Sequence, residues 1–571
     1  MTLSSSVSRP HPANSRSDSW DWRNPSAPHR LAPFFILNED LETPLSRARI
    51  RTMLEQFRDL GYGGAYLHPR LGMVTEYKSE AWFEAISYCR EEAERLGLLT
   101  YLYDENTYPS GFAGGHVPAL HPEARVRYAA WEILRGLPNA LNHFTTTIDA
   151  SDLFLAAWHL ESEEPLRLGA RLDAEELAVW TQDQHRAAMG KIRPEGAIVA
   201  FFLREMKGSP WHGEFPYVSL ADPVVAKAFL ESTHEEYRRR MRQHFGKSIP
   251  AIFTDEPSLL TQNAGAGAAT LHLTPYILAE FQRRRGYDLK ENLAALFFDH
   301  GEYRAVRFDY YETLHALWLE NWALPLERWC GEHGIALTGH YLEHDWPAPY
   351  STPGHVHLLA HMHWPGIDLL YANGLAGEPA PWFSLQKSAP VAGKEPHLAL
   401  LVHQCASVAR QLGREKVLCE AWGAGGHASR PADYKRLGDW LVVLGINHLV
   451  PHHSMMTLRG ARKADHPQFF SDQSSWFPQL RPLNDHLARL CQAMSRGHDE
   501  RHILVLDPLT SGYLAARRAS PLEQTHSGLC NEFSNFVQEL ADQFLAFDLG
   551  DEYVLEEFGR PEAGGLRIEQ I

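Results

Sequence analysis

Two glutamates that follow short apolar runs are the residues of this sequence best suited to chemistry. Glu256 lies in "AIFTDEP" (251–257) and Glu420 lies in "CEAWG" (419–423). Two carboxyl groups can hydrolyse a glycosidic bond, since one protonates the leaving oxygen while the other attacks the sugar or activates water. The acid of such a pair usually has a raised pKa, to which the neighbouring Asp255 would contribute like-charge repulsion. The pair therefore predicts a glycoside hydrolase.

Both glutamates also have a purely structural interpretation. Glu256 precedes "PSLL", where an acid would favour the N-terminus of a helix. Glu420 would instead form a salt bridge with an arginine inside a barrel. The sequence leaves these alternatives open.

Further polar and aromatic residues follow other apolar runs along the chain. In (β/α)8 enzymes the active site lies at the carboxyl ends of the strands, so we expect these residues to meet at one mouth. Aromatic rings would stack on the apolar C–H faces of a sugar, and polar groups would bind its hydroxyls. The residues that we predict to bind substrate are Arg70, Asp104, Glu105, Tyr108, Asp255, His340, Tyr371, Trp422, His452 and His453.

Histidine pairs offer a different chemistry. "GHVHLLAHMHW" contains His355 with His357 and His361 with His363, which suits a metal-dependent hydrolase. A zinc amidohydrolase would carry its histidine pair at the end of the first strand, where this chain has "LNED". We therefore keep metal-dependent hydrolysis as the weaker alternative and assign no residue as a metal ligand.

The elements that must position these residues alternate between amphipathic helices and buried apolar strands. This pattern predicts parallel pairing in an α/β fold. Eight strands follow in order, the number that closes a (β/α)8 TIM barrel. The expected strands are 32–40, one ending near Leu67, one ending near Tyr103, 250–257, 335–345, 366–374, 416–423 and 446–454.

Three segments fall outside that alternation. Residues 1–30 are predicted to be a polar, disordered arm, and the barrel is predicted to span 31–500 with an inserted β subdomain at about 140–215. Residues 501–571 resemble part of a flavodoxin-like α/β domain, with one long helix over 531–559 and a second strand at the end of the sequence. Two strands are too few for a complete open α/β domain.

Composition and charge indicate which classes of binding partner and which cellular compartment suit this chain. The formal net charge of −17 argues against nucleic acid, which needs clustered Lys and Arg. No apolar run is long enough to span a membrane, and the N-terminus lacks the apolar core of a secretory signal. The six separated cysteines suit a reducing compartment. We expect a cytoplasmic protein that acts on a carbohydrate substrate. The sequence does not determine its oligomeric state.

The motifs "GYGGAYLHPRLG", "YLYDENTYPSGFAGG", "FTDEP", "GHYLEH", "CEAWGAGG" and "GINHLVPHHS" resemble, in that order, the catalytic domain of glycoside hydrolase family 106. The resemblance covers about residues 30–550. It implies a (β/α)8 barrel, hydrolysis of terminal α-L-rhamnosides with inversion, and a Ca²⁺ ion near the substrate. Glu256 matches the general acid, and Glu420 matches the base that activates water, with Glu343 in reserve.

One alternative from another class remains, a catalytically silent carbohydrate-binding barrel. The stereochemistry also depends on geometry, because carboxyl groups about 5–5.5 Å apart indicate retention and about 6.5–9.5 Å apart indicate inversion.

Overall fold

A computed structural model describes most of the chain. The described residues are 21–135, 153–163, 166–173, 176–177, 180, 197–259, 269–343, 346–347, 349–370, 395–427, 429–497, 499–517, 527–562 and 565–568. Most of the predicted N-terminal arm and the predicted binding residue Tyr371 lie outside them.

Parallel strands form the centre of the molecule. The eight predicted strands are present in the predicted order, as β1 (Phe34–Leu37), β2 (Gly64–Pro69), β3 (Leu99–Tyr103), β8 (Ala251–Thr254), β10 (Ala336–Gly339), β11 (Gly366–Leu369), β12 (Leu418–Ala421) and β13 (His448–Pro451). Parallel pairing joins β1, β2, β3, β8 and β10 in one sheet and β11, β12 and β13 in a second sheet. The α/β class is therefore confirmed.

Backbone hydrogen bonds link the two sheets at both seams. The amide of Trp364, just before β11, donates to the carbonyl of Leu337 in β10 at 3.1 Å. At the other seam, the amide of Ala32 donates to the carbonyl of Leu449 in β13 at 3.2 Å. The short strand β14 (Ser454–Met455), which directly follows β13, pairs in parallel with β1. These links follow the order that a (β/α)8 barrel requires.

The strands also share one apolar cluster that draws on both sheets. Its buried members are Ala32, Phe34, Ile36, Tyr66, Tyr101, Tyr103, Ala251, Phe253, Leu418, Val450, Met455 and Phe469. They alternate along each strand with residues of the larger outer core, as the two-residue period of a strand requires. The strands thus have an inner and an outer face, and the helices cover the outer one.

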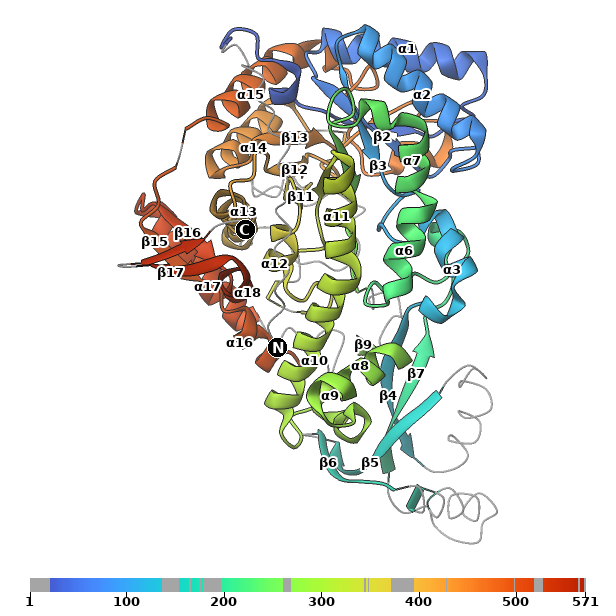
Figure 1. The fold of residues 1–571 in the computed structure, drawn as a ribbon, viewed down its shortest axis with the longest axis vertical. Coiled ribbons are helices and arrows are strands. Elements are labelled where there is room, and N and C mark those ends of the chain that lie inside the picture. The colour runs from blue at the N-terminus through green and yellow to red at the C-terminus, as the bar shows by residue number, and fades with distance from the viewer. Residues whose placement is uncertain are drawn as a thin grey trace.

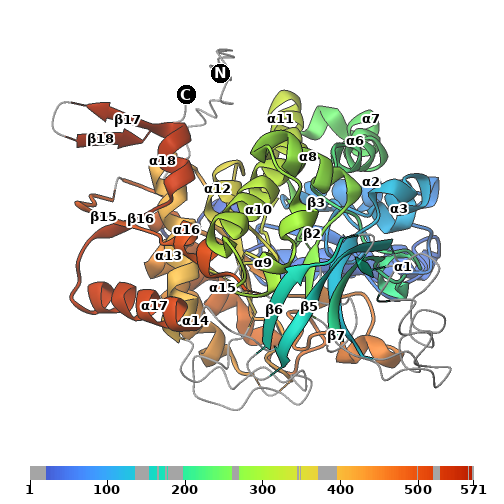
Figure 2. The same ribbon diagram turned by 90° about the horizontal axis from the view of Figure 1, so that it is seen from below.

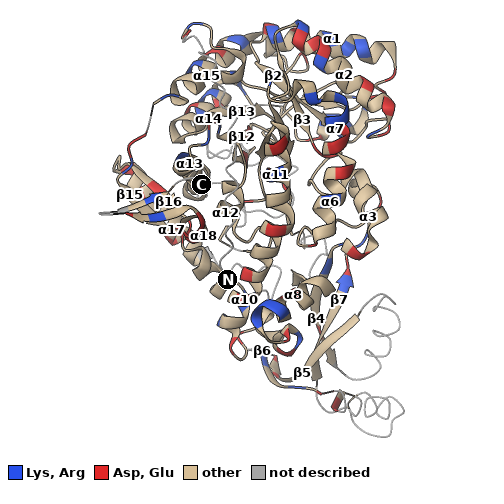
Figure 3. Ribbon diagram, in the orientation of Figure 1, with Lys and Arg blue, Asp and Glu red and all other residues tan. Residues whose placement is uncertain are grey.

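Two of the surrounding helices illustrate how a side chain satisfies a free backbone amide at the N-terminus. Thr43 caps α1 (Pro44–Asp59) through its side chain, and Ser79 caps α2 (Glu80–Arg95) in the same way. Charged residues of both signs interleave on α1, α2 and α7 (His234–Met241), as Figure 3 shows. The other helices over the strands are α6 (Pro223–Ser232), α10 (Tyr303–Trp318), α11 (Leu324–His333), α12 (His355–Ala360), α13 (Glu395–Gln411), α14 (Pro431–Leu444) and α15 (Leu480–Met494).

Four of the five strands of an antiparallel sheet lie between β3 and β8 in the chain, where the sequence predicts an inserted β subdomain, and the fifth follows β8. The order in this sheet is β6 (Leu166–Arg171), β5 (Leu153–Glu163), β7 (Ala197–Glu205), β4 (Arg127–Arg135) and β9 (Thr270–His272). Two of these strands, β4 and β9, lie outside the expected range of 140–215. The sheet occupies one end of the long axis of the molecule (Figures 1 and 2).

The C-terminal segment packs on the flank formed by α12 and α13 (Figure 1). Strand β15 (Ile503–Leu506) pairs in parallel with β16 (Phe547–Gly550), and Leu400 and Leu401 of α13 share a buried cluster with Val537, Phe547 and Leu549. The expected single helix over 531–559 is wrong. It is α17 (Ser527–Asp542), then β16, then α18 (Glu552–Phe558), because "FDLG" continues the sheet.

The expected terminal strand also differs in its pairing. Residues Gly565–Ile568 form β18, which pairs antiparallel with β17 (Gly559–Glu562) and adds no strand to the parallel pair. Among the residues that the structure describes, no helix is both long and apolar enough to cross a membrane.

Candidate active site

One buried residue from each of the eight strands lies at the carboxyl end of the inner face. The period of two places Asp255 in phase with Phe253, Glu420 with Leu418 and His452 with Val450, which all belong to the inner cluster. The full set is Asn38, His68, Tyr103, Asp255, His340, Asp368, Glu420 and His452, each at most 5% exposed. Tyr103 is a member of this set that strand-end reasoning missed.

Asp255, His340 and Glu420 form the centre of this set. His340 Nε2 lies 3.0 Å from Glu420 Oε2 and 3.4 Å from Asp255 Oδ1, and the three atoms all lie within 4.8 Å of one another. On the other side of Glu420, His452 Nε2 is 3.6 Å from Oε1. Glu420 therefore has an imidazole facing each carboxylate oxygen, rather than the arginine of the structural interpretation.

Glu343 supports His340 from the opposite edge of the ring. Its Oε2 lies 3.8 Å from His340 Nδ1, and its Oε1 accepts the backbone amide of Asp368 at 2.7 Å. Burial lowers the pKa of His340, but the carboxylates of Glu343 and Glu420, which accept hydrogen bonds from the ring, outweigh it, so the pKa stands well above its usual value. His340 is therefore a buried cation among carboxylates.

Asp255 is held in place by its neighbours. The Tyr103 hydroxyl donates to Asp255 Oδ2, and the backbone amide of Asp255 donates to Ser110 Oγ at 2.8 Å. Burial, followed by the charge of Glu420, raises the pKa of Asp255 to about 7. Asp255 is thus positioned by the loop after β3 as well as by its own strand.

Glu256 differs from the other carboxylates in its backbone conformation and in the hydrogen bonding of its carboxyl group. Its φ of +45° takes the chain out of the strand, so its side chain leaves the alternation of β8. It is half-buried, and no hydrogen bond or ion pair to its carboxyl group is found among the described residues. Burial, and then the adjacent Asp255, raise its pKa to about 8. Glu256 is therefore a carboxyl group that stays protonated at neutral pH.

The two acids after β3 serve the loop that follows them. Asp104 Oδ1 accepts a hydrogen bond from Ser110 Oγ at 2.6 Å. Glu105 accepts four backbone amides, from Asn106 and Gly114 on Oε1 at 2.7 and 2.6 Å and from Gly111 and Ala113 on Oε2 at 3.1 and 2.7 Å. Its carboxylate is enclosed by the loop, so the structure places it apart from the central group.

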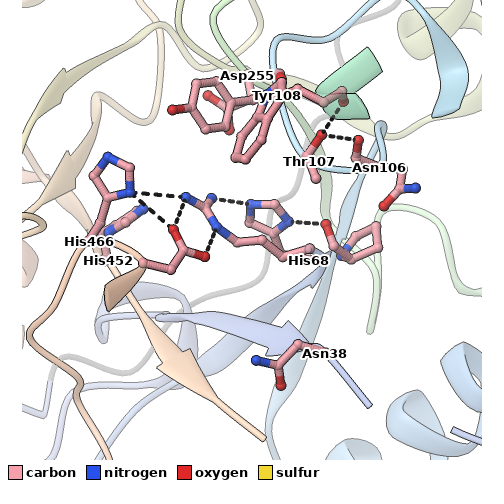
Figure 4. A network of polar contacts seen from close by, with 12 residues as sticks. Asn38, His68, Asn106, Thr107, Tyr108, Asp255, His452 and His466 are labelled. Carbon is pink, nitrogen blue, oxygen red and sulfur yellow. Dashed lines mark hydrogen bonds and ion pairs between the residues drawn. The ribbon is translucent and has the colours of Figure 1, made fainter. Parts of the chain in front are cut away.

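Arg70 belongs to a chain of polar contacts that includes His68 and His466, both labelled in Figure 4. It forms a bidentate ion pair with Asp465 at 2.7 and 2.9 Å, and its Nη1 lies 3.2 Å from His68 Nε2. Its guanidinium stacks over the half-buried ring of Tyr108 at 5.4 Å. Arg70 and Tyr108 thus stand together, and the guanidinium fixes the position of the aromatic ring.

The remaining predicted residues point in different directions. Trp422 has a φ of +68° and packs into the outer core against Tyr434 and Phe470, away from the inner face. The ring of His453 stacks on His452 and, in parallel planes, on Phe469.

Some contributors could not be found by looking at strand ends. Asp465 lies in the long segment after β14, which carries no strand or motif signal, and Ser110 lies within a loop. Tyr103 could have been found, because the two-residue period places it, and not Asp104, on the inner face.

The calcium ion implied by the family resemblance does not fit the acidic groups described here. Ca²⁺ takes six to eight oxygen ligands. Among the described His, Cys, Asp and Glu residues, the groups able to hold a metal ion are Asp255–His340–Glu420 and His357–His361–Glu557. Each includes an imidazole nitrogen, which suits a transition metal better than calcium.

Comparisons with known proteins identify the fold. No family model and no curated protein sequence matches the chain. A solved rhamnosidase from Novosphingobium sp. PP1Y is similar with a TM-score of 0.61 at 15% identity, over 96% of this chain and 65% of that one. A cold-adapted β-galactosidase from Rahnella sp. R3 gives a TM-score of 0.50 at 9% identity, over 91% and 65%.

A third structure, the GH42 β-galactosidase Gan42B, gives a TM-score of 0.50 at 10% identity, over 92% of this chain and 66% of that one. The chain thus spans slightly less than two thirds of the length of these three structures. It has the fold of a glycoside hydrolase.

Proposed function

We propose that this protein is a glycoside hydrolase with a (β/α)8 barrel that removes terminal sugar residues, α-L-rhamnosides first among them. The observation that carries the proposal is the contrast between two carboxyl groups: Glu420 has an imidazole beside each oxygen, whereas Glu256 has a pKa raised to about 8 by burial and by charges that include Asp255 and Glu420. The fold similarity to a rhamnosidase and the family 106 motifs support the choice of sugar.

In the proposed mechanism Glu256 is the general acid. A pKa of about 8 keeps it protonated at neutral pH, so that it can give a proton to the leaving oxygen. The absence of a competing partner among the described residues leaves that proton available to substrate.

Glu420 is the proposed base. His340 at 3.0 Å and His452 at 3.6 Å flank its two oxygens, so the carboxylate that would activate water is held in place by two imidazoles. Asp255 lies close to Glu420, within 4.8 Å oxygen to oxygen. Its negative charge raises the energy of an ionised Glu256 and so supports the acid.

The test is a panel of aryl glycosides beginning with the α-L-rhamnoside, assayed on wild type and on Glu420→Gln. We expect hydrolysis by wild type and a kcat lower by several orders of magnitude in the variant, with an unchanged circular dichroism spectrum. NMR of the first-formed product should show inversion at the anomeric carbon. Sugar binding by calorimetry without any turnover on the panel would instead establish a silent carbohydrate-binding barrel.

One observation favours a second candidate, a metal-dependent hydrolase. The ligand atoms of Asp255, His340 and Glu420 are close enough to share one ion, and a metal-bound water would replace Glu420 as the source of hydroxide. Full activity after exhaustive dialysis against a chelator would rule it out. Loss of activity, restored by a divalent metal, would select it.

A further inference from the structure

A second polar group lies where the C-terminal segment meets the helices around the strands. His357 belongs to α12 and His361 follows its last turn, so the two imidazoles stand on one side of the helix at a spacing of four residues. Glu557 comes from α18, almost two hundred residues later in the chain. Its Oε2 lies 2.8 Å from His357 Nε2 and 3.2 Å from His361 Nε2.

These distances match the spacing of ligands around a tetrahedral metal ion. Zn²⁺ bonds to imidazole nitrogen and carboxylate oxygen are about 2.0–2.2 Å long, which sets neighbouring ligand atoms about 3.3 Å apart. Both distances to Glu557 Oε2 are close to that value, and the three ligand atoms all lie within 4.8 Å of one another. Two imidazoles and one carboxylate form a ligand set that zinc uses commonly.

Both histidines have a hydrogen-bond partner on the ring nitrogen that faces away from the group. His361 Nδ1 lies 2.9 Å from Glu327 Oε2, a carboxylate in α11. His357 Nδ1 lies 3.1 Å from His315 Nε2 in α10. Metal-binding histidines almost always have such a partner, which fixes the tautomer and orients the ring.

The burial of the group also differs between its members. The side chains of His357 and His361 are 7% and 2% exposed, whereas that of Glu557 is 41% exposed. The ion would therefore be held firmly on the side of α12 while a fourth position stays open to water. Among the described residues, no hydrogen bond or ion pair directly joins this group to the central group of Asp255, His340 and Glu420.

We propose that His357, His361 and Glu557 bind one divalent transition-metal ion, Zn²⁺ in the first place, which fastens α18 to α12. Binding displaces the protons on the two Nε2 atoms and leaves Nδ1 of His361 as a donor to Glu327. This site is independent of the proposed sugar chemistry, so the failure of one proposal would not affect the other.

The competing explanation is a metal-free network in which Glu557 only accepts hydrogen bonds from the two imidazoles. Zinc retention separates the two. Purified full-length protein is stripped with a chelator, equilibrated with Zn²⁺, freed of excess ion and analysed for metal. We expect about one equivalent of zinc in wild type, and the visible spectrum of the Co²⁺-loaded protein should show the intense d–d bands of tetrahedral coordination.

Two variants assign the ion to this group. Glu557→Ala changes a partly exposed side chain and should lower zinc affinity at least tenfold in competition with a chromophoric chelator, without unfolding the protein. The double variant His357→Ala/His361→Ala should retain no zinc. Glu556→Gln changes the adjacent exposed acid and should bind zinc as wild type does.

A third variant, His340→Gln, tests the group of Asp255, His340 and Glu420 as an alternative zinc site. It should still bind about one equivalent of zinc. The proposal is overturned if wild type retains no zinc, if Glu557→Ala binds zinc as tightly as wild type, or if His340→Gln alone removes the ion. A thermal scan provides a second measurement, since removing zinc should lower the Tm of wild type but not that of Glu557→Ala.

Discussion

His340 Nε2 lies 3.0 Å from Glu420 Oε2 and only 0.4 Å farther, at 3.4 Å, from Asp255 Oδ1. One buried imidazole thus holds two carboxylates that come from opposite sheets, and Glu343 faces its other nitrogen. The arrangement stabilises Glu420 and Asp255 against their mutual repulsion, and it leaves Glu256 as the carboxyl group outside the network. This division of the acids underlies the predictions below.

Replacing the proposed acid should lower kcat/KM more for substrates with poor leaving groups than for substrates with good ones. Glu256→Gln removes the proton donor, so kcat/KM should fall by about 10²–10⁴-fold on an alkyl glycoside. A nitrophenyl glycoside needs little protonation and should lose much less. Glu214→Gln is a matched control, because Glu214 is exposed and also has a positive φ, of 69°. Equal losses on both substrates would contradict the role of Glu256 as acid.

The pH dependence of the wild-type enzyme should show the same group. A general acid works only while protonated, and the pKa of Glu256 is about 8. We therefore expect kcat/KM to fall as pH rises through about 8, and the residual activity of Glu256→Gln to lack that limb. A wild-type profile that stays flat to pH 9.5 would show that Glu256 is not the acid.

His340 should act as a positioning residue with a pH signature. In His340→Gln the cation between the carboxylates is lost, and the pKa of Asp255, which the charge of His340 lowers, should rise above its wild-type value of about 7. The acidic limb of kcat/KM should then move to higher pH, and kcat should fall by more than tenfold while KM changes little. Titrating activity from pH 4 to 8 measures the shift. A lower kcat with an unmoved acidic limb would indicate a structural role only.

Glu256 should also reduce the stability of the fold at high pH. Its pKa is about 8 in the folded protein against an ordinary 4.5, so between these values the folded state binds more protons than the unfolded chain. Stability therefore falls as pH rises through that interval. Glu256→Gln cannot ionise, and its Tm should exceed that of wild type by about 1–3 °C at pH 9. At pH 4 the difference should vanish, and a difference independent of pH would refute this explanation.

The strands and their order could be predicted from sequence because buried parallel strands are short, continuous apolar runs between helices. β8 and β12, "AIFT" and "LCEA", are examples. The strand-end rule then found Asp255, His340, Glu343, Glu420 and His452 together. What it lacked was the phase of each strand, which decides whether the last residue faces inward.

Because the strand-end rule does not include the phase of each strand, several side chains lie on a different face from the one we predicted. Tyr103, not Asp104, faces the inner side because it is two residues from Tyr101. Trp422 is in phase with Glu420, but its left-handed backbone turns the ring outward. No local sequence pattern predicts that change of direction. The pairing of Arg70 with Asp465 joins residues 395 apart in sequence, so only the folded chain reveals it. Whether the predicted residues bind sugar remains a prediction.

Glu105 gives the sharpest test of whether a predicted binding residue touches substrate. Its two oxygens accept four backbone amides of the loop 106–114, and this loop carries Tyr108 and Ser110. In Glu105→Gln one oxygen becomes an NH₂ group that faces amide donors, so we expect a loss of about 1–3 kcal/mol in the free energy of unfolding. Because the loop positions Asp255 through Ser110, kcat should fall together with Tm. Thermal scans and initial rates measure both, and Glu76→Gln, which changes a nearby exposed acid, should leave both unchanged. An unchanged Tm with a raised KM would mean that Glu105 binds the sugar directly, because a residue that only holds the loop cannot weaken substrate binding without weakening the fold.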